Sequence, residues 1–321
     1  ELDTLNFESF VEDSLRHLYM TSSLGDVAIK GDAILKGVDE AVAKILDDAV
    51  PTYFEKEYNV ADNQGGLVVY ASFNEKLNDV VSVFLPAFRI DSNLEVRGSL
   101  FLDPPLLNFS AKSQGISYST FVLDSFELKG GFSDSVFNVD LIADTISFNK
   151  NIRVENLNLQ SGFSEDSVNL YLDYFNTGDK RYAGEINLTG KILGAKHFGF
   201  HLNDAFVEVA DSVWVFNDEN YVEIDSNFIR IDSLNVSSFD KYISLQGRIS
   251  ESVKDTINLE FNNLNLSNIG RMTNKEDLVL GGTASGKITS QSTLSNPNVL
   301  MNVSILGLEL NEMPIGSGDL V

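Results

Sequence analysis

The sequence lacks cysteine altogether and is poor in several other residue types. Its 321 residues include no cysteine, one tryptophan, three histidines and six prolines. Without cysteine, the chain has no disulfide scaffold, thiol nucleophile, iron–sulfur cluster or cysteine-based zinc site. Basic residues are also scarce, because 23 Lys and Arg stand against 47 Asp and Glu, for a net charge of −24. This balance excludes a general nucleic-acid-binding protein, since neutralising phosphates requires clustered basic side chains.

Long apolar runs are missing too. No window approaches about 18 uninterrupted apolar residues, so the sequence predicts no membrane-spanning helix. The chain begins at Glu1 without a signal peptide, and residues 315–321 begin a new apolar pattern. We therefore expect a fragment of a longer protein. Hydrophobic residues still make up 43% of the sequence, which predicts a folded chain despite its charge.

Alternation of apolar and polar residues is the dominant pattern. Side chains of a strand point alternately to its two faces, so this pattern predicts strands with one apolar and one polar face. Clusters of Gly, Ser, Asn and Asp recur about every 8 to 14 residues, as between consecutive antiparallel strands. The residues that we assign to the apolar faces are Phe137, Val139, Leu141, Val168, Leu170, Leu172, Ile257, Leu259, Phe261, Val299, Met301 and Val303.

An internal repeat accompanies the alternation. Residues 124–135 return in similar form at 155–167, and 243–252 is a looser copy. Repeats of about 20 to 50 residues are typical of arrays in which each unit packs on its neighbours. The repeat unit is expected to hold two or three strands joined by short polar turns.

The first quarter of the chain departs from this pattern. Residues 38–58 carry apolar side chains at helical spacing, interrupted by Pro51, and 75–84 is a second short helical candidate. We predict a partly helical N-terminal segment over 1–64 and a repetitive β region over 65–321 that continues beyond the C-terminus of this sequence. The segment 38–58 is acidic, which favours a helix packed on a sheet over one lying on an anionic membrane.

Candidate catalytic and metal sites are weak. His197 and His201 lie on a predicted strand about 13 Å apart, too far to share one ion. Residues 281–287 superficially resemble a phosphate-binding loop but lack its spacing, and no nucleophile elbow is present. An acidic group around Trp214 could form an acid/base pair or a calcium site; we interpret it as solvated turns and polar faces. Its members are Asp211, Asp218, Glu219, Glu223 and Asp225. We predict no enzyme activity, cofactor or metal.

Three stretches, at 211–224, 242–269 and 280–316, resemble the TamB family of the translocation and assembly module in its Bacteroidota-like form. The third is the most specific: a glycine-rich strand is followed by a turn at Asn296-Pro297. Residues 65–200 share only the style of the repeat.

The resemblance implies a fold and a function. TamB-like proteins are similar to AsmA-like and bridge-like lipid-transfer proteins. They are anchored in the inner membrane of Gram-negative bacteria and cross the periplasm as a repetitive antiparallel sheet curled into a U-shaped, taco-like groove with an apolar interior. The expected fold is therefore mainly β with one or two short helices. The expected function is non-enzymatic phospholipid transport and outer-membrane biogenesis, with acyl chains against the twelve apolar residues and a TamA- or BamA-like β-barrel partner.

Other interpretations stay open. Exposed sheet edges could pair with strands of nascent β-barrel proteins, which would make the chain an assembly scaffold. A plain β-sandwich surface module would have the same alternation, because two sheets can cover each other's apolar faces. A β-helical polysaccharide lyase or hydrolase would need clustered carboxylates, and those of this sequence are scattered.

Overall fold

The fold comes from a computed structural model and is mainly β, a repetitive antiparallel sheet as predicted. Two compact units divide the chain, residues 1–177 (unit 1) and 178–321 (unit 2). The structure describes residues 4–32, 38–53, 65–102, 104–148, 152–177, 182–209, 212–267, 279–294 and 296–321.

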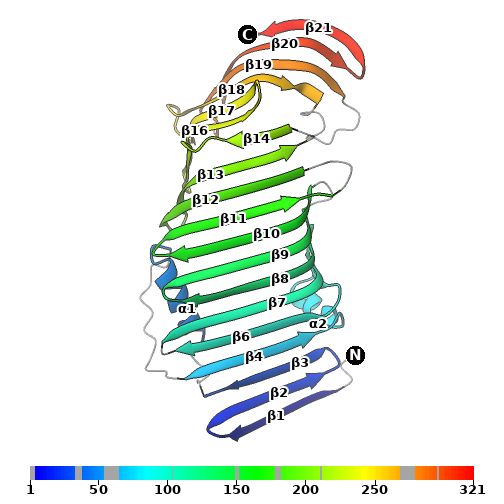
Figure 1. Cartoon of the computed structure of the whole chain (residues 1–321), viewed down its shortest axis with the longest axis vertical. Coiled ribbons are helices and arrows are strands. Elements are labelled where there is room, and N and C mark those ends of the chain that lie inside the picture. The colour runs from blue at the N-terminus through cyan, green and yellow to red at the C-terminus, as the bar shows by residue number, and fades with distance from the viewer. Residues whose placement is uncertain are drawn as a thin grey trace. The chain divides into compact units, whose positions relative to one another are not determined.

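Unit 1 is a meander in which strands pair antiparallel in chain order (Figure 1). The short strand β5 pairs with one end of β7, while β6 pairs with the rest of β7 and with β4. Its strands are β1 (Leu5–Glu12), β2 (Leu15–Ser22), β3 (Gly25–Gly31), β4 (Gly66–Phe73), β5 (Phe88–Ile90), β6 (Leu94–Leu102), β7 (Pro105–Tyr118), β8 (Phe121–Ser133), β9 (Val136–Phe148), β10 (Ile152–Ser164) and β11 (Ser167–Phe175).

Two helices are described, and both belong to unit 1. Helix α1 (Val38–Ala49) starts where the sequence predicts it and ends just before Pro51, which cannot continue a helix; 54–64 lies outside the described residues. Helix α2 (Leu77–Phe84) falls within the predicted 75–84. The Asn78 side chain ties it to β5 by accepting from the N–H of Ile90 and donating to its carbonyl, both at 2.8 Å.

Strands β1 to β3 were not anticipated by the sequence patterns. They precede α1, and β3 pairs along its whole length with β4. Strands on either side of the predicted boundary at residue 64 therefore lie in the same sheet.

Unit 2 is also an antiparallel meander. As in unit 1, two shorter strands share one place in the sheet. Strands β14 and β15 pair with opposite ends of β13 and both pair with β16. Its strands are β12 (Tyr182–Gly194), β13 (His197–Val209), β14 (Ser212–Phe216), β15 (Tyr221–Ile224), β16 (Phe228–Ser238), β17 (Lys241–Ser250), β18 (Thr256–Asn265), β19 (Leu280–Gln291), β20 (Asn298–Leu310) and β21 (Met313–Leu320).

The 31-residue repeat has a clear structural meaning. Each copy begins with one strand residue in the left-handed region, Ser125 (φ 43°) in β8 and Asn156 (φ 49°) in β10. Each copy then ends in a two-residue hairpin turn with both φ angles positive, at 134–135 and 165–166, which is the type I′ geometry. Asn and Asp tolerate the left-handed region better than most residues, because their short side chains can bond locally.

Candidate functional site

The sheet of unit 1 has one apolar face, which we name the apolar face of unit 1. The register aligns one apolar side chain from each of five adjacent strands across it. This row, which we call the α1 row, consists of Leu100, Leu107, Phe132, Phe137 and Phe163.

The opposite face is charged. Glu95 lies between Arg97 (3.6 Å) and Lys112 (3.3 Å), and Lys129 contacts Glu127 at 2.8 Å. The hydrogen bond from Lys129 lowers the pKa of the Glu127 carboxyl below its ordinary value. Exposed pairs of this kind stabilise little, but they make this face unsuitable for burial against apolar partners.

The six residues predicted from the sequence in unit 1 all lie on the apolar face. The register pairs the three β11 residues with β10 residues that in turn pair with the three β9 residues. Phe137 packs in the cluster beneath α1, while Leu141 and Leu172 pack in a second cluster further along the strands. The set is Phe137, Val139, Leu141, Val168, Leu170 and Leu172.

The six predicted residues of unit 2 likewise share one face of its sheet. Gly286 of β19 pairs with both Phe261 and Val303, which places the β18 and β20 residues on the same side. Phe261 and Val303 are buried together, whereas Val299 and Met301 are exposed. The set is Ile257, Leu259, Phe261, Val299, Met301 and Val303.

The second cluster of unit 1 is buried although only strand residues form it. Its buried members are Leu123, Phe126, Ala143 and Leu157, and its partly buried members also come from strands β6 to β11. Leu123 and Phe126 are three residues apart yet on the same face, because the left-handed Ser125 between them breaks the pleat. Figure 1 shows that the long strands of unit 1, such as β8 and β9, are curved.

The cluster has the properties of an interior. Phe126 is only 6% exposed, and burial raises the pKa of Tyr174, which packs at its edge. A flat face without a second layer would leave such side chains open to solvent. The left-handed Ser125 places Leu123 and Phe126 on one face, which strict alternation could not reveal.

Helix α1 packs against the α1 row. Its buried side chains are Ala41, Ile45 and Ala49, which contact Leu100 and Phe132. The apolar spacing of the sequence predicted that this helix would cover a sheet, but gave no signal for which strands it covers.

A polar contact holds the C-terminal end of α1 to the β10–β11 hairpin. The N–H of Thr52 donates to Oδ1 of Asp166 at 2.8 Å, and the Thr52 hydroxyl donates to the same carboxylate. The N–H of Asp166 in turn donates to the carbonyl of Ala49 at 3.2 Å. We call these three bonds the Thr52–Asp166 contact.

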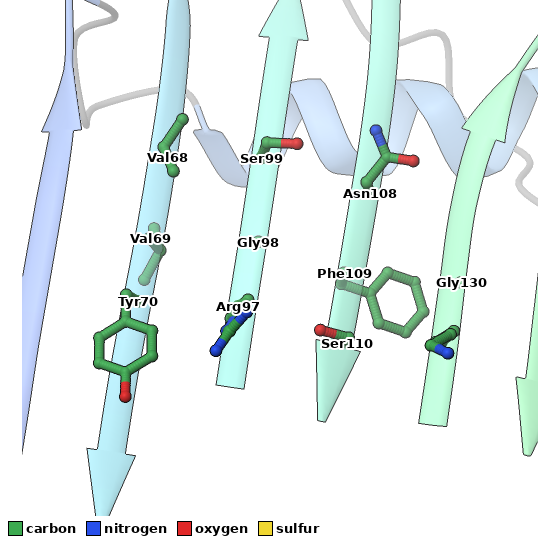
Figure 2. A pocket seen from close by; sticks show the side chains of 11 residues that line it. Val68, Val69, Tyr70, Arg97, Gly98, Ser99, Asn108, Phe109, Ser110 and Gly130 are labelled. Atoms are coloured by element: carbon green, nitrogen blue, oxygen red, sulfur yellow. The ribbon is translucent and has the colours of Figure 1, made fainter. Parts of the chain in front are cut away.

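A hollow of about 480 Å³ lies over strands β4, β6, β7 and β8 (Figure 2). On the apolar face the register aligns Val69, Gly98, Phe109 and Gly130 across it. The Phe109 ring leans over Gly130, where an added Cβ would lie 2.3 Å from it. At Gly98 an added Cβ would meet only a backbone oxygen at 3.7 Å. Gly98 therefore faces open space. The sequence could not reveal this, because it does not distinguish a glycine with free space around it from one against a neighbouring strand.

The hollow is next to the α1 row. Gly98, Phe109 and Gly130 stand two positions along their strands from Leu100, Leu107 and Phe132 of the α1 row. The rings of Phe109 and Phe137 are stacked with centroids 6.2 Å apart. Residues lining the hollow are Val68, Val69, Tyr70, Arg97, Gly98, Ser99, Asn108, Phe109, Ser110, Lys129 and Gly130.

The histidines and acidic residues of unit 2 have different hydrogen-bond partners and do not form one cluster. Nε2 of His197 donates to Glu223 at 2.7 Å, whereas Nδ1 of His201 donates to the carbonyl of Asn220. Asp225 accepts from the backbone N–H of Asn227, which lowers the pKa of its carboxyl. Among the described residues no group of three His, Asp or Glu side chains is placed to hold a metal ion; Asp211 lies outside them.

Comparison with known proteins gives no relative. No family model, curated protein or solved structure matches the chain. Within the part of the chain that the structure describes, neither helix is long and apolar enough to cross a membrane. Function must therefore be argued from the apolar faces and the hollow.

Proposed function

We propose that this chain is the periplasmic segment of a TamB-like protein, a non-enzymatic conduit for phospholipids between the inner and outer membranes of a Gram-negative bacterium. In the full-length protein, an inner-membrane anchor and a TamA- or BamA-like β-barrel partner would complete the pathway. The observation that carries the proposal is the apolar face of unit 1, which side chains from adjacent strands line in register and the hollow extends.

The burial pattern supports a concave face. Phe126 and Leu157 are shielded by side chains of their own sheet, which a curved face achieves and a flat face does not. The left-handed residues Ser125 and Asn156 supply bends at equivalent places in two strands. A sheet curled in this way would form the U-shaped groove that the proposed conduit requires.

The hollow supports an acyl-chain ligand. Its volume lies within the range of about 300–1,000 Å³ that is usual for ligand pockets. On the apolar face, Val69 and Phe109 offer only carbon to a ligand, so binding would come from apolar burial, about 0.8 kcal/mol per methylene. The phosphate headgroup would stay at the open side in water.

Gly98→Leu tests this assignment. A Cβ at position 98 would meet only a backbone oxygen at 3.7 Å, so the new side chain starts in the open space of the hollow. Ser117→Leu is the control, because it adds a leucine on the polar face of β7, outside the residues that line the hollow. Both variants would be incubated with phosphatidylethanolamine and phosphatidylglycerol vesicles that carry a diazirine acyl chain. We expect Gly98→Leu to lose labelling at Phe109 and Ser117→Leu to keep it. Equal labelling of the two variants, or no adduct in the wild type, would overturn the assignment.

Transport can be tested further along the face. Leu170→Asp places a carboxylate on the apolar face, where an acyl chain would have to pass it. We expect lipid transfer between donor and acceptor vesicles to fall strongly. Asn169→Asp adds the same charge on the opposite face of β11 and should leave transfer unchanged.

A second candidate is the assembly scaffold. Among the described residues β1 pairs only with β2, and its side chains are exposed along its whole length, including Leu5, Phe7 and Val11. An edge of this kind can add a strand from another chain. Photocrosslinkers in β1 would then capture outer-membrane β-barrel proteins, whereas crosslinkers on the apolar face would not.

A plain β-sandwich finds less support in unit 1. Every strand described in residues 4–177 belongs to one meander, so no second sheet of this unit closes its apolar face.

A further inference from the structure

Helix α1 occupies part of the surface on which acyl chains would lie. Its buried side chains contact Leu100 and Phe132, and Phe137 and Phe163 pack against the same cluster. Phe137 is also one of the residues that the conduit would use. An acyl chain and α1 cannot cover the α1 row at the same time.

The contact between α1 and the sheet is modest. Two of its three buried side chains are alanines, and Ile45 is the one large side chain among them; Val38 and Val42 of the helix are only partly buried against the same cluster. A 12-residue helix is marginal by itself in water, and its position depends on this packing and on the Thr52–Asp166 contact. Its other face is exposed and charged, including Asp39, Glu40 and Asp48.

The position of α1 relative to the hollow determines where a bound acyl chain would meet the helix. The hollow begins one row beyond the α1 row, so a chain bound over Gly98 would meet the helix if it extended along β7 past Phe109. The site beside the helix is open while the row beneath it is closed.

We propose that α1 is a displaceable plug that competes with phospholipid acyl chains for the α1 row. Lipid enters the hollow with α1 in place and reaches the α1 row only when the helix leaves. The Thr52–Asp166 contact holds the plug closed. This inference rests on the proposed lipid function and adds a regulatory element to it.

The absence of cysteine makes a direct test possible. A chain with Thr52→Cys and Asp166→Cys can form only one intramolecular disulfide, between positions whose side chains are already in contact. The same diazirine phospholipid vesicles would be applied to the oxidised and reduced forms, and adducts would be mapped by mass spectrometry. We expect adducts at Leu107 to fall at least several-fold on oxidation, while adducts at Leu172 stay constant.

A second pair of variants covers the case in which the disulfide does not form. Asp166→Gly removes the carboxylate that holds α1, and Glu165→Gly alters the same turn without touching the helix. Both positions have positive φ, so glycine introduces no strain at either. Asp166→Gly should raise labelling at Leu107 several-fold, and Glu165→Gly should not.

The outcomes separate the two proposals. If Leu172 is labelled and Leu107 responds neither to the disulfide nor to Asp166→Gly, the plug is wrong and the conduit stands. If neither position is labelled in any form, the conduit itself is wrong, and the plug falls with it.

Discussion

Replacing Phe126 by alanine tests whether the apolar face of unit 1 is an interior. Phe126 stands in β8 between Ser113 of β7 and Ala143 of β9, and it is 6% exposed. The hydrophobic side chains that the structure describes in its cluster all come from strands. Its cost on truncation therefore measures how far the sheet folds over its own apolar face.

The expected magnitude follows from the buried area. A buried phenylalanine hides roughly 150–250 Å², worth about 4–6 kcal/mol at about 25 cal/mol per Å². A compact unfolded state lowers this figure, and measured Phe→Ala changes in cores cost about 3–5 kcal/mol. We expect Phe126→Ala to lose about 3 kcal/mol or more of unfolding free energy. Ile142→Ala, at a 56% exposed position on the polar face of β9, should lose less than about 1 kcal/mol.

The assay must report on unit 1. The single tryptophan, Trp214, belongs to unit 2 and would not do so directly. Hydrogen exchange of β7 to β9 peptides under increasing urea gives the local opening free energy instead. If Phe126→Ala lowers the unfolding free energy no more than Ile142→Ala does, the face is flat and exposed to solvent. The argument for a concave interior then fails.

Three further predictions concern the backbone and pH. Ser125→Gly should keep the unfolding midpoint in urea, whereas Ser125→Val should lose about 1–2 kcal/mol, because a β-branched residue resists the left-handed region. Gly31→Ala should lower thermal stability, since its Cβ would lie 2.2 Å from a backbone oxygen of the neighbouring strand, while Gly98→Ala should not. Glu155 accepts from the N–H and hydroxyl of Thr177, which lowers its pKa. Its contribution is present above its ordinary pKa and is lost as the pH falls below about 4. Urea midpoints at pH 7 and 3.5 should thus differ more in the wild type than in Glu155→Gln.

Much of the fold followed from short-range pattern. Period-two alternation predicted the antiparallel strands and assigned residues such as Leu170 and Phe261 to one face of each sheet, because side-chain direction depends only on position within a strand. The repeat was visible because residues 124–135 and 155–167 match in sequence, and each copy holds one strand residue with positive φ, Ser125 or Asn156.

The remaining features depend on contacts between distant residues. The footprint of α1 is fixed by Thr52 meeting Asp166, 114 positions away, and no local pattern encodes such a pair. The hollow arises because the Phe109 ring leans toward Gly130 and away from Gly98, a rotamer choice that depends on packing. Strands β5 and β6 both pair with β7, at different parts of its length. The sequence shows them only as two separate strands, because it does not reveal this common partner.

Several hairpin turns of this chain combine a positive φ with a negative charge. Where the sheet needs a positive φ, the residue is often acidic, as at Asp13, Asp134, Glu165 and Asp166. Glycine would fit these turns with less strain, but it would carry no charge. Acidic turns repel one another between molecules, so the residues that close the hairpins also oppose the stacking of two apolar faces. The lipid conduit that we propose would need both properties, curvature that shields its interior and charge that keeps other copies from covering it.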